Sequence, residues 1–86
     1  HAHVALRAGR RQRLARTLLD FSAAAHRPAF ELAETHQEIA SRLGTVREVV
    51  SRNLARFQSE GLIQIGKKQI RILDPEGLQR EAETEF

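Results

Sequence analysis

The fold can be worked out from residues 35–63, THQEIASRLGTVREVVSRNLARFQSEGLI. Thr35 and Glu38 have the Thr-x-x-Glu spacing of a capping box, in which each side chain bonds the other residue's backbone N–H at a helix start. Glycine adopts positive φ without a steric penalty, so Gly44 would end this helix after about two turns. Between these signals lies the apolar stripe Ile39, Ala40 and Leu43.

A second helix is expected directly after this turn. Thr45 and Glu48 repeat the capping-box spacing. Apolar residues then recur at i, i+4, i+8 and i+11, the spacing of a helix face turned toward a core: Val46, Val50, Leu54 and Phe57. The pattern predicts a helix over residues 46–59 that closes at Glu60 and Gly61. Two capped helices joined by a three-residue turn containing glycine are typical of a helix-turn-helix.

Two elements are predicted before this motif. Residues 10–25 have the pattern of an amphipathic helix, with apolar residues at i, i+4, i+7 and i+11: Leu14, Leu18, Phe21 and Ala25. A proline disfavours the α conformation in the residue before it, so this helix should stop at residues 26–28, His-Arg-Pro. Residues 30–32 alternate apolar and polar, which allows one brief strand.

A hairpin and a last helix are predicted after the motif. Residues 62–65 and 70–73 are short β-branched runs, and residues 66–69, Gly-Lys-Lys-Gln, would form a basic tip between them. Asp74 is a suitable helix N-cap, and Pro75 suits the first helical position.

The expected fold is mostly α with a small β-hairpin wing, an α+β winged helix-turn-helix in the order α-β-α-α-β-β-α. With 86 residues, 41% of them hydrophobic, the chain has enough apolar material for one small core. We expect residues 10–86 to form this domain and residues 1–9 to be the end of a dimerisation helix and hinge, or a trimmed end. The sequence contains no methionine, so we expect a piece of a longer protein.

Composition excludes several kinds of protein. The chain has no cysteine, which excludes disulfides, thiolate zinc sites and a cysteine nucleophile, and fits a reducing cytoplasm. No apolar run approaches the roughly 20 residues that span a bilayer, so no membrane partner is expected. Without Trp or Tyr, the chain has few side chains on which single-stranded bases could stack. Its net charge of +3 permits a polyanionic partner without requiring one.

The predicted second helix of the motif carries a polar outward face. Residues rotate by about 100° around a helix. If Val50, Leu54 and Phe57 face the core, the outward side near the N-terminus holds Arg47, Glu48, Ser51 and Arg52. Arginine donates two hydrogen bonds to guanine O6 and N7, glutamate accepts from cytosine N4, and serine can adapt to either kind of edge. These side chains are therefore candidates for base contacts in a major groove.

Residues 35–63 closely resemble the DNA-binding domain of the Crp/Fnr family of bacterial transcription regulators. The resemblance extends through RLARTLLDF at residues 13–21 and IRILDPEGL at residues 70–78. It implies a cytoplasmic protein that binds double-stranded DNA sequence-specifically and is not an enzyme.

The resemblance also implies which residues contact DNA. In one branch of the family an Arg-Glu-x-x-x-Arg set reads a TGA-containing half-site, and it matches Arg47, Glu48 and Arg52. In the other branch a Glu-x-x-Ser-Arg set matches Glu48, Ser51 and Arg52, so both patterns are present. The family anchors a phosphate at the start of the first helix of the pair, which corresponds to Thr35, His36 and Gln37.

Family members carry a sensor domain and a long dimerisation helix before the DNA-binding domain. The resemblance therefore implies a homodimer of the longer protein on an inverted-repeat site, and it allows a contact with RNA polymerase. Residues 3–8 would hold the tail of the dimerisation helix, with a hinge near Gly9. We expect no cofactor in this fragment, because the effector would bind the sensor domain, and we expect the fragment to be monomeric or weakly dimeric.

The sequence leaves structural alternatives open for several residues. Glu48 could serve only its helix, through the capping box and an i, i+4 pair with Arg52. Lys67 and Lys68 could be a solvated turn instead of a phosphate contact. The arginines between residues 7 and 16 could be a solvated helix face, a nonspecific DNA contact or the flank of a dimer helix.

The function of the whole domain also has an alternative. The sequence has no glycine-rich phosphate loop, no HExxH and no serine on a nucleophile elbow, so an enzyme is not expected. A winged helix could instead be a protein-interaction module without base readout. Such a module should have an apolar or acidic outward face, whereas this one carries Arg47 and Arg52 on either side of Glu48. DNA binding is therefore preferred.

Overall fold

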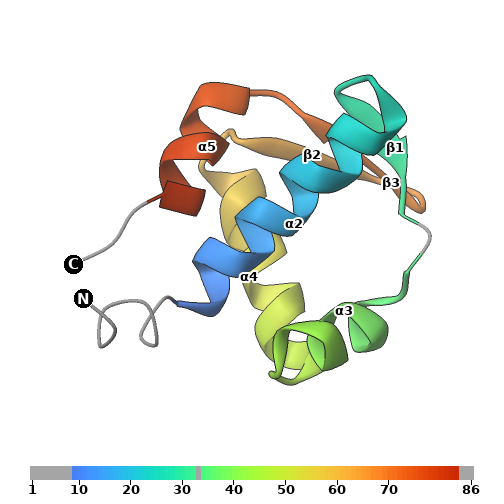
Figure 1. Cartoon of the computed structure of the whole chain (residues 1–86), viewed down its shortest axis with the longest axis vertical. Coiled ribbons are helices and arrows are strands. Elements are labelled where there is room, and N and C mark those ends of the chain that lie inside the picture. Colours follow the sequence, from blue (N-terminus) through green and yellow to red (C-terminus); the bar gives the residue numbers. More distant parts are fainter. Residues whose placement is uncertain (1–8, 33, 84–86) are drawn as a thin grey trace.

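The structure is a computed structural model, which describes residues 9–32 and 34–83 (Figure 1). The described residues form an α+β winged helix-turn-helix with its elements in the expected order. The elements are α2 (Arg10–Ala25), β1 (Ala29–Glu31), α3 (His36–Leu43), α4 (Arg47–Ser59), β2 (Ile63–Gly66), β3 (Gln69–Ile72) and α5 (Pro75–Glu83). The dimerisation-helix tail expected at residues 3–8 lies outside the described residues.

Both ends of α3 follow the sequence prediction. Thr35 Oγ1 accepts a hydrogen bond from the N–H of Glu38 at 3.1 Å, and the Glu38 carboxylate accepts one from the N–H of Thr35 at 2.8 Å. At the other end Gly44 has a φ of 71°. The N–H groups of Gly44 and Thr45 then donate to carbonyls in the last turn of α3. The predicted capping box and glycine stop are therefore confirmed.

The start of α4 differs from the prediction. Because the N–H of Thr45 closes α3, the next residue, Val46, becomes the N-cap of α4, without any side-chain hydrogen bond to the helix. The predicted capping box of Thr45 and Glu48 is wrong, and α4 begins at Arg47 rather than at residue 46. Val46 was also predicted to face the core, yet its side chain is 58% exposed.

One hydrophobic core joins the helices to the sheet. Its largest fully buried side chains are Phe57, Leu14, Leu18, Ile39, Leu54, Ile63, Ile70, Leu78 and Val50. The three strands are antiparallel in the order β1-β3-β2, with Phe30 opposite Ile70. Phe21 packs at the edge of the core, its ring 5.9 Å from that of Phe30 between centroids. Ala25 was predicted on the same stripe but is exposed, because it is the last residue of α2 and the chain turns away at His26.

The hairpin and α5 complete the domain. Gly66 pairs with Gln69, so only Lys67 and Lys68 lie between β2 and β3. The strand bounds differ by one residue from those predicted. The carboxylate of Asp74 accepts from the N–H of Gly77 at 3.0 Å, which confirms the predicted cap, and α5 packs against α2. Within the described ranges, each helix is too short or too polar to span a bilayer.

Candidate nucleic-acid interface

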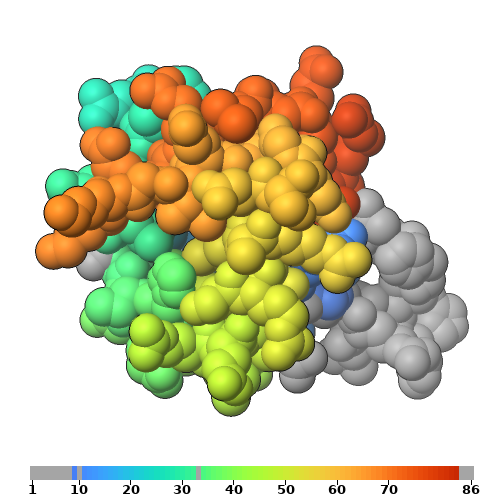
Figure 2. Space-filling view, turned by 180° about the vertical axis from the view of Figure 1, so that it is seen from behind, coloured from blue at the N-terminus to red at the C-terminus, as the bar shows by residue number. Residues whose placement is uncertain are grey.

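The first half of α4 presents polar side chains away from the core. Val50 and Leu54 are each 1% exposed, so the rotation of about 100° per residue turns the positions between them outward. The α4 outer face, as we call it, consists of exposed Arg47, Glu48 and Arg52 and half-buried Ser51. Figure 2 shows α4 across the middle of one side of the molecule, with α3 next to it and the hairpin projecting at the edge.

The arginines of the chain divide into paired and unpaired groups. Among the described residues, ion pairs with carboxylates join Arg11 to Glu81, Arg42 to Glu34, and Arg56 to Glu60. By contrast, the side chains of Arg47 and Arg52 make no hydrogen bond or ion pair with any residue of ranges 9–32 and 34–83. Arg16 and Arg71 are also unpaired there, but they lie on α2 and β3. The guanidinium donors of the α4 outer face are thus available to a ligand.

Glu48 has neither of the structural roles that the sequence left open. It completes no capping box, because Val46 and not Thr45 is the N-cap of α4. In the part of the chain that the structure describes, no ion pair joins it to Arg52. Its carboxylate lies in the first turn of the helix, where the helix dipole favours negative charge. The carboxylate can therefore accept a hydrogen bond from a ligand.

Ser51 has a partner that the sequence did not predict. Its Oγ lies 2.8 Å from Nδ1 of His36, the first residue of α3. The two residues are 15 positions apart and on different helices, so no local spacing connects them. The bond joins a predicted base contact to a predicted phosphate contact.

A shallow recess lies at the N-terminus of α3. It is lined by Thr35, His36, Gln37 and Arg47. The three residues predicted as a phosphate anchor therefore share one surface with the first residue of α4. Free N–H groups and the helix dipole make such an N-terminus suitable for an anion. Thr35 Oγ1 is already occupied in capping α3, so its side chain has a confirmed structural role as well.

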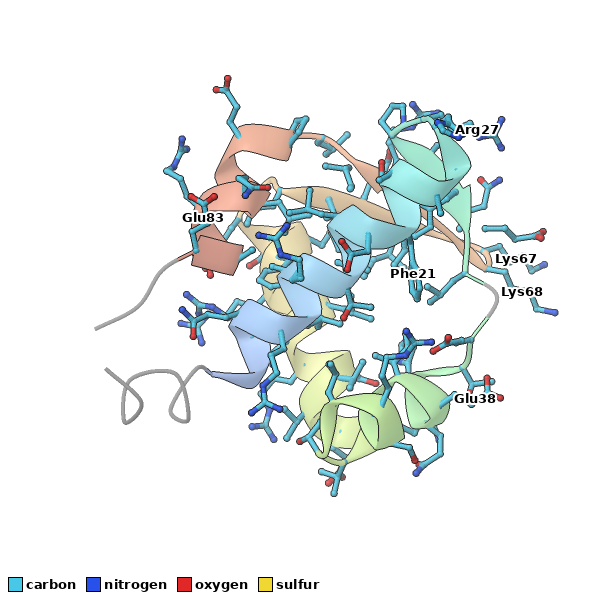
Figure 3. All side chains as sticks on the ribbon, in the orientation of Figure 1. Phe21, Arg27, Glu38, Lys67, Lys68 and Glu83 are labelled. Atoms are coloured by element: carbon cyan, nitrogen blue, oxygen red, sulfur yellow. The ribbon has the colours of Figure 1, made fainter. Side chains whose placement is uncertain are left out.

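The two lysines of the hairpin extend from its tip. In Figure 3 the side chains of Lys67 and Lys68 point away from the body of the domain, on the same side as Glu38 near the start of α3. Both residues are exposed, and neither side chain has a hydrogen bond or ion pair within the described ranges. The structure thus brings the two lysines to the side of the domain on which α3 begins.

The arginines of α2 are partly engaged inside the domain. Arg11 pairs with Glu81 of α5 at 2.8 Å, and Arg13 donates to the carbonyl of Leu43 at 3.0 Å. Both bonds connect α2 to other elements. Tertiary packing therefore brings acceptors to both side chains, although Arg13 remains exposed to solvent.

Comparison with known proteins identifies the family. Residues 12–81 match the model of the Crp-like helix-turn-helix domain. The transcriptional regulator LdrP of Thermus thermophilus is 37% identical over 76 residues, which cover 84% of this chain and 39% of that protein. The chain spans between 20% and 39% of the length of the curated relatives that it matches, among them the transcriptional regulatory protein btr of Bordetella pertussis and LdrP.

Solved structures give the same result. A transcriptional regulator of the crp/fnr family from Eubacterium rectale superposes with a TM-score of 0.77 at 34% identity, covering 86% of this chain and 33% of that one. The catabolite activator protein of Thermus thermophilus superposes with a TM-score of 0.72 at 32% identity, covering 85% and 33%. The chain therefore belongs to the family of Crp-like helix-turn-helix domains, the DNA-binding domains of Crp/Fnr transcription regulators.

Proposed function

We propose that this domain binds double-stranded DNA in the bacterial cytoplasm and reads a TGA-containing half-site with α4 in the major groove. The observation that carries the proposal is the α4 outer face, on which Arg47, Glu48 and Arg52 are exposed and have no partner among the described residues. Its relatives are transcriptional regulators, which supports the same function.

Each residue of the α4 outer face has a chemical complement on a base edge. Arg47 and Arg52 supply paired donors for guanine O6 and N7, and Glu48 supplies an acceptor for cytosine N4. The central pair of a TGA step is G·C, which presents both kinds of edge in the major groove. An arginine and Glu48 can therefore engage the two strands of one base pair, while Ser51 contacts a neighbouring base.

Phosphate contacts would flank this readout. The recess formed by Thr35, His36 and Gln37 would hold one phosphate at the N-terminus of α3. Lys67 and Lys68 would approach the backbone from the wing. Such contacts fix the position of a protein on the duplex without adding sequence information.

In the longer protein, we propose a homodimer on an inverted repeat. Two domains related by a twofold axis would read half-sites about 34 to 36 Å apart. Contact with RNA polymerase and response to an effector would be properties of that longer protein. The domain itself would act by binding, without catalysis and without a cofactor.

The test is selection from a random duplex library at several salt concentrations, followed by sequencing of the retained DNA. We expect enrichment of a TGA-containing motif. A matched control replaces Arg47, Glu48 and Arg52 together by alanine, and folding is checked by circular dichroism. The control should bind weakly and enrich no motif. Absent binding by the unaltered chain, or salt-dependent binding without a motif, would contradict base readout by this domain alone. Either the dimerisation region of the longer protein would then be required, or the domain would be a protein-interaction module.

A further inference from the structure

We propose that His36 sets the hydrogen-bonding polarity of Ser51 and thereby decides which kind of base edge Ser51 reads. His36 would be a positioning residue for base readout in addition to contacting a phosphate. This inference rests on the proposed DNA binding and adds a determinant of specificity to it.

The geometry places the imidazole between two contacts. Nδ1 lies 2.8 Å from Ser51 Oγ, in a contact that is partly buried between α3 and α4. The same side chain lines the recess at the N-terminus of α3. Within the described residues, Nε2 makes no hydrogen bond, so this nitrogen is available to a phosphate oxygen.

A bound phosphate would select one tautomer of the ring. A neutral imidazole has one donor nitrogen and one acceptor nitrogen. Phosphate oxygens only accept, so a contact at Nε2 requires the proton to be on Nε2. In the neutral ring Nδ1 of His36 is then an acceptor, and the hydroxyl hydrogen of Ser51 points at it, whereas a doubly protonated ring would donate from both nitrogens and leave that hydrogen free.

This arrangement leaves Ser51 Oγ with only lone pairs to offer to DNA. In the major groove the complementary groups are the amino groups, adenine N6 and cytosine N4. Thymine O4 and guanine O6 also only accept, so neither could form a hydrogen bond with Ser51 Oγ in this arrangement. Phosphate docking at His36 would thus convert an adaptable serine hydroxyl into a reader of amino groups.

Replacement of His36 by arginine gives the sharpest test, because a guanidinium can only donate. In His36→Arg the Ser51 hydroxyl must accept from the arginine, which frees its hydrogen for thymine O4 or guanine O6. The base pair that Ser51 reads is located first, by repeating the selection with Ser51→Ala. It is the position of the DNA motif at which this variant no longer prefers any base. At this position we expect the unaltered chain to prefer bases with an amino group by about 2- to 12-fold, the effect of one net hydrogen bond. In His36→Arg this preference should be lost or inverted.

Two controls separate polarity from a merely structural effect. In a Ser51→Ala background, His36→Arg should leave the preference at this position unchanged, because the reader is absent. Gln37→Ala removes a different residue of the recess and should lower affinity for all sequences alike. A preference at the Ser51 position that is the same in the unaltered chain and in His36→Arg would overturn the proposal.

A second measurement needs no variant of His36. In duplexes that carry an adenine or cytosine at the Ser51 position, the base is replaced by an analogue without the exocyclic amino group. Removal of the amino group should lower the affinity of the unaltered chain by the same factor as the base preference that Ser51→Ala removes. The affinity of Ser51→Ala should be the same for both duplexes. Equal affinity of the unaltered chain for both duplexes would contradict amino-group readout. A chain that enriches no motif would instead overturn the proposed function, and this inference with it.

Discussion

Arg52 and Glu48 differ from Arg56 on the same helix in having no partner within the described chain, whereas Arg56 pairs with Glu60 at 3.5 Å. The two exposed side chains contribute little to the fold, so their replacement should act on DNA binding and not on folding. We predict that Arg52→Ala and Glu48→Ala each relax base preference at one position and cost about 1 to 3 kcal/mol on the correct site.

Competition binding against duplexes with single-base substitutions measures this prediction. Arg56→Ala is the matched control, since it removes an arginine of α4 that is already engaged, and it should leave every base preference unchanged. If Arg52→Ala and Glu48→Ala discriminate between correct and scrambled duplexes as the unaltered chain does, their assignment as base contacts is wrong.

The N-terminus of α4 is a weak point of the fold. Val46 occupies the N-cap in an extended conformation, with φ −115° and ψ 157°, and has no side-chain oxygen to bond the free N–H groups of the first turn. Serine adopts the same backbone conformation and supplies that oxygen. We therefore predict that Val46→Ser raises the free energy of unfolding by about 0.5 to 2 kcal/mol.

Urea denaturation followed by circular dichroism measures the change. Val46→Ala is the control, because it also removes the exposed apolar side chain but adds no oxygen. Equal stability of the serine and alanine variants would show that the cap of α4 is satisfied in another way.

The hairpin is expected to act on DNA by charge alone. Lys67 is exposed at the tip and has no partner in the described part of the chain. We predict that Lys67→Ala weakens binding to all sequences alike and lowers the slope of log K against log salt by about one unit. A salt titration on specific and random duplexes tests this. Arg11→Ala is the control, since Arg11 is held by Glu81 on another part of the domain. An unchanged slope would show that Lys67 makes no phosphate contact and is only part of a solvated turn.

At the scale of the whole molecule, the described ranges offer little apolar surface for self-association. In the described ranges, only three large hydrophobic side chains are exposed, and they lie on separate segments: Val46, Ile65 and Leu73. A stable interface buries about 800 Å² on each partner. We predict that the chain sediments as a monomer of 9.7 kDa. It should bind two half-sites of an inverted repeat independently, so that mutation of one half-site leaves affinity for the other unchanged. A tight dimer in sedimentation would contradict this.

Much of this architecture follows from signals that operate over a few residues. The capping box of Thr35 and Glu38, the stops at Gly44 and Gly61 and the N-cap at Asp74 depend only on neighbours within one helical turn. The rotation of a helix likewise separates the α4 outer face from Val50 and Leu54 without any knowledge of the partner elements. Such features can be predicted because their causes are local.

The second predicted capping box was wrong because two local signals competed for one residue. Thr45 could cap α4 or close α3, and the structure uses its N–H to close α3. The spacing of residues along the chain could not decide which of these two roles Thr45 has. The element order was unaffected, but the start of α4 and the exposure of Val46 changed.

The order and approximate length of the elements and the outward face of α4 were therefore encoded in local sequence, together with the family to which the chain belongs. Packing determined which polar groups meet: Arg11 with Glu81, Arg13 with the carbonyl of Leu43, and His36 with Ser51. Packing also left Arg47, Glu48 and Arg52 without partners among the described residues. The physical reason is that contacts between residues far apart in the chain depend on how whole helices cross, and this geometry arises from the shared core and not from the spacing of residues along any one helix.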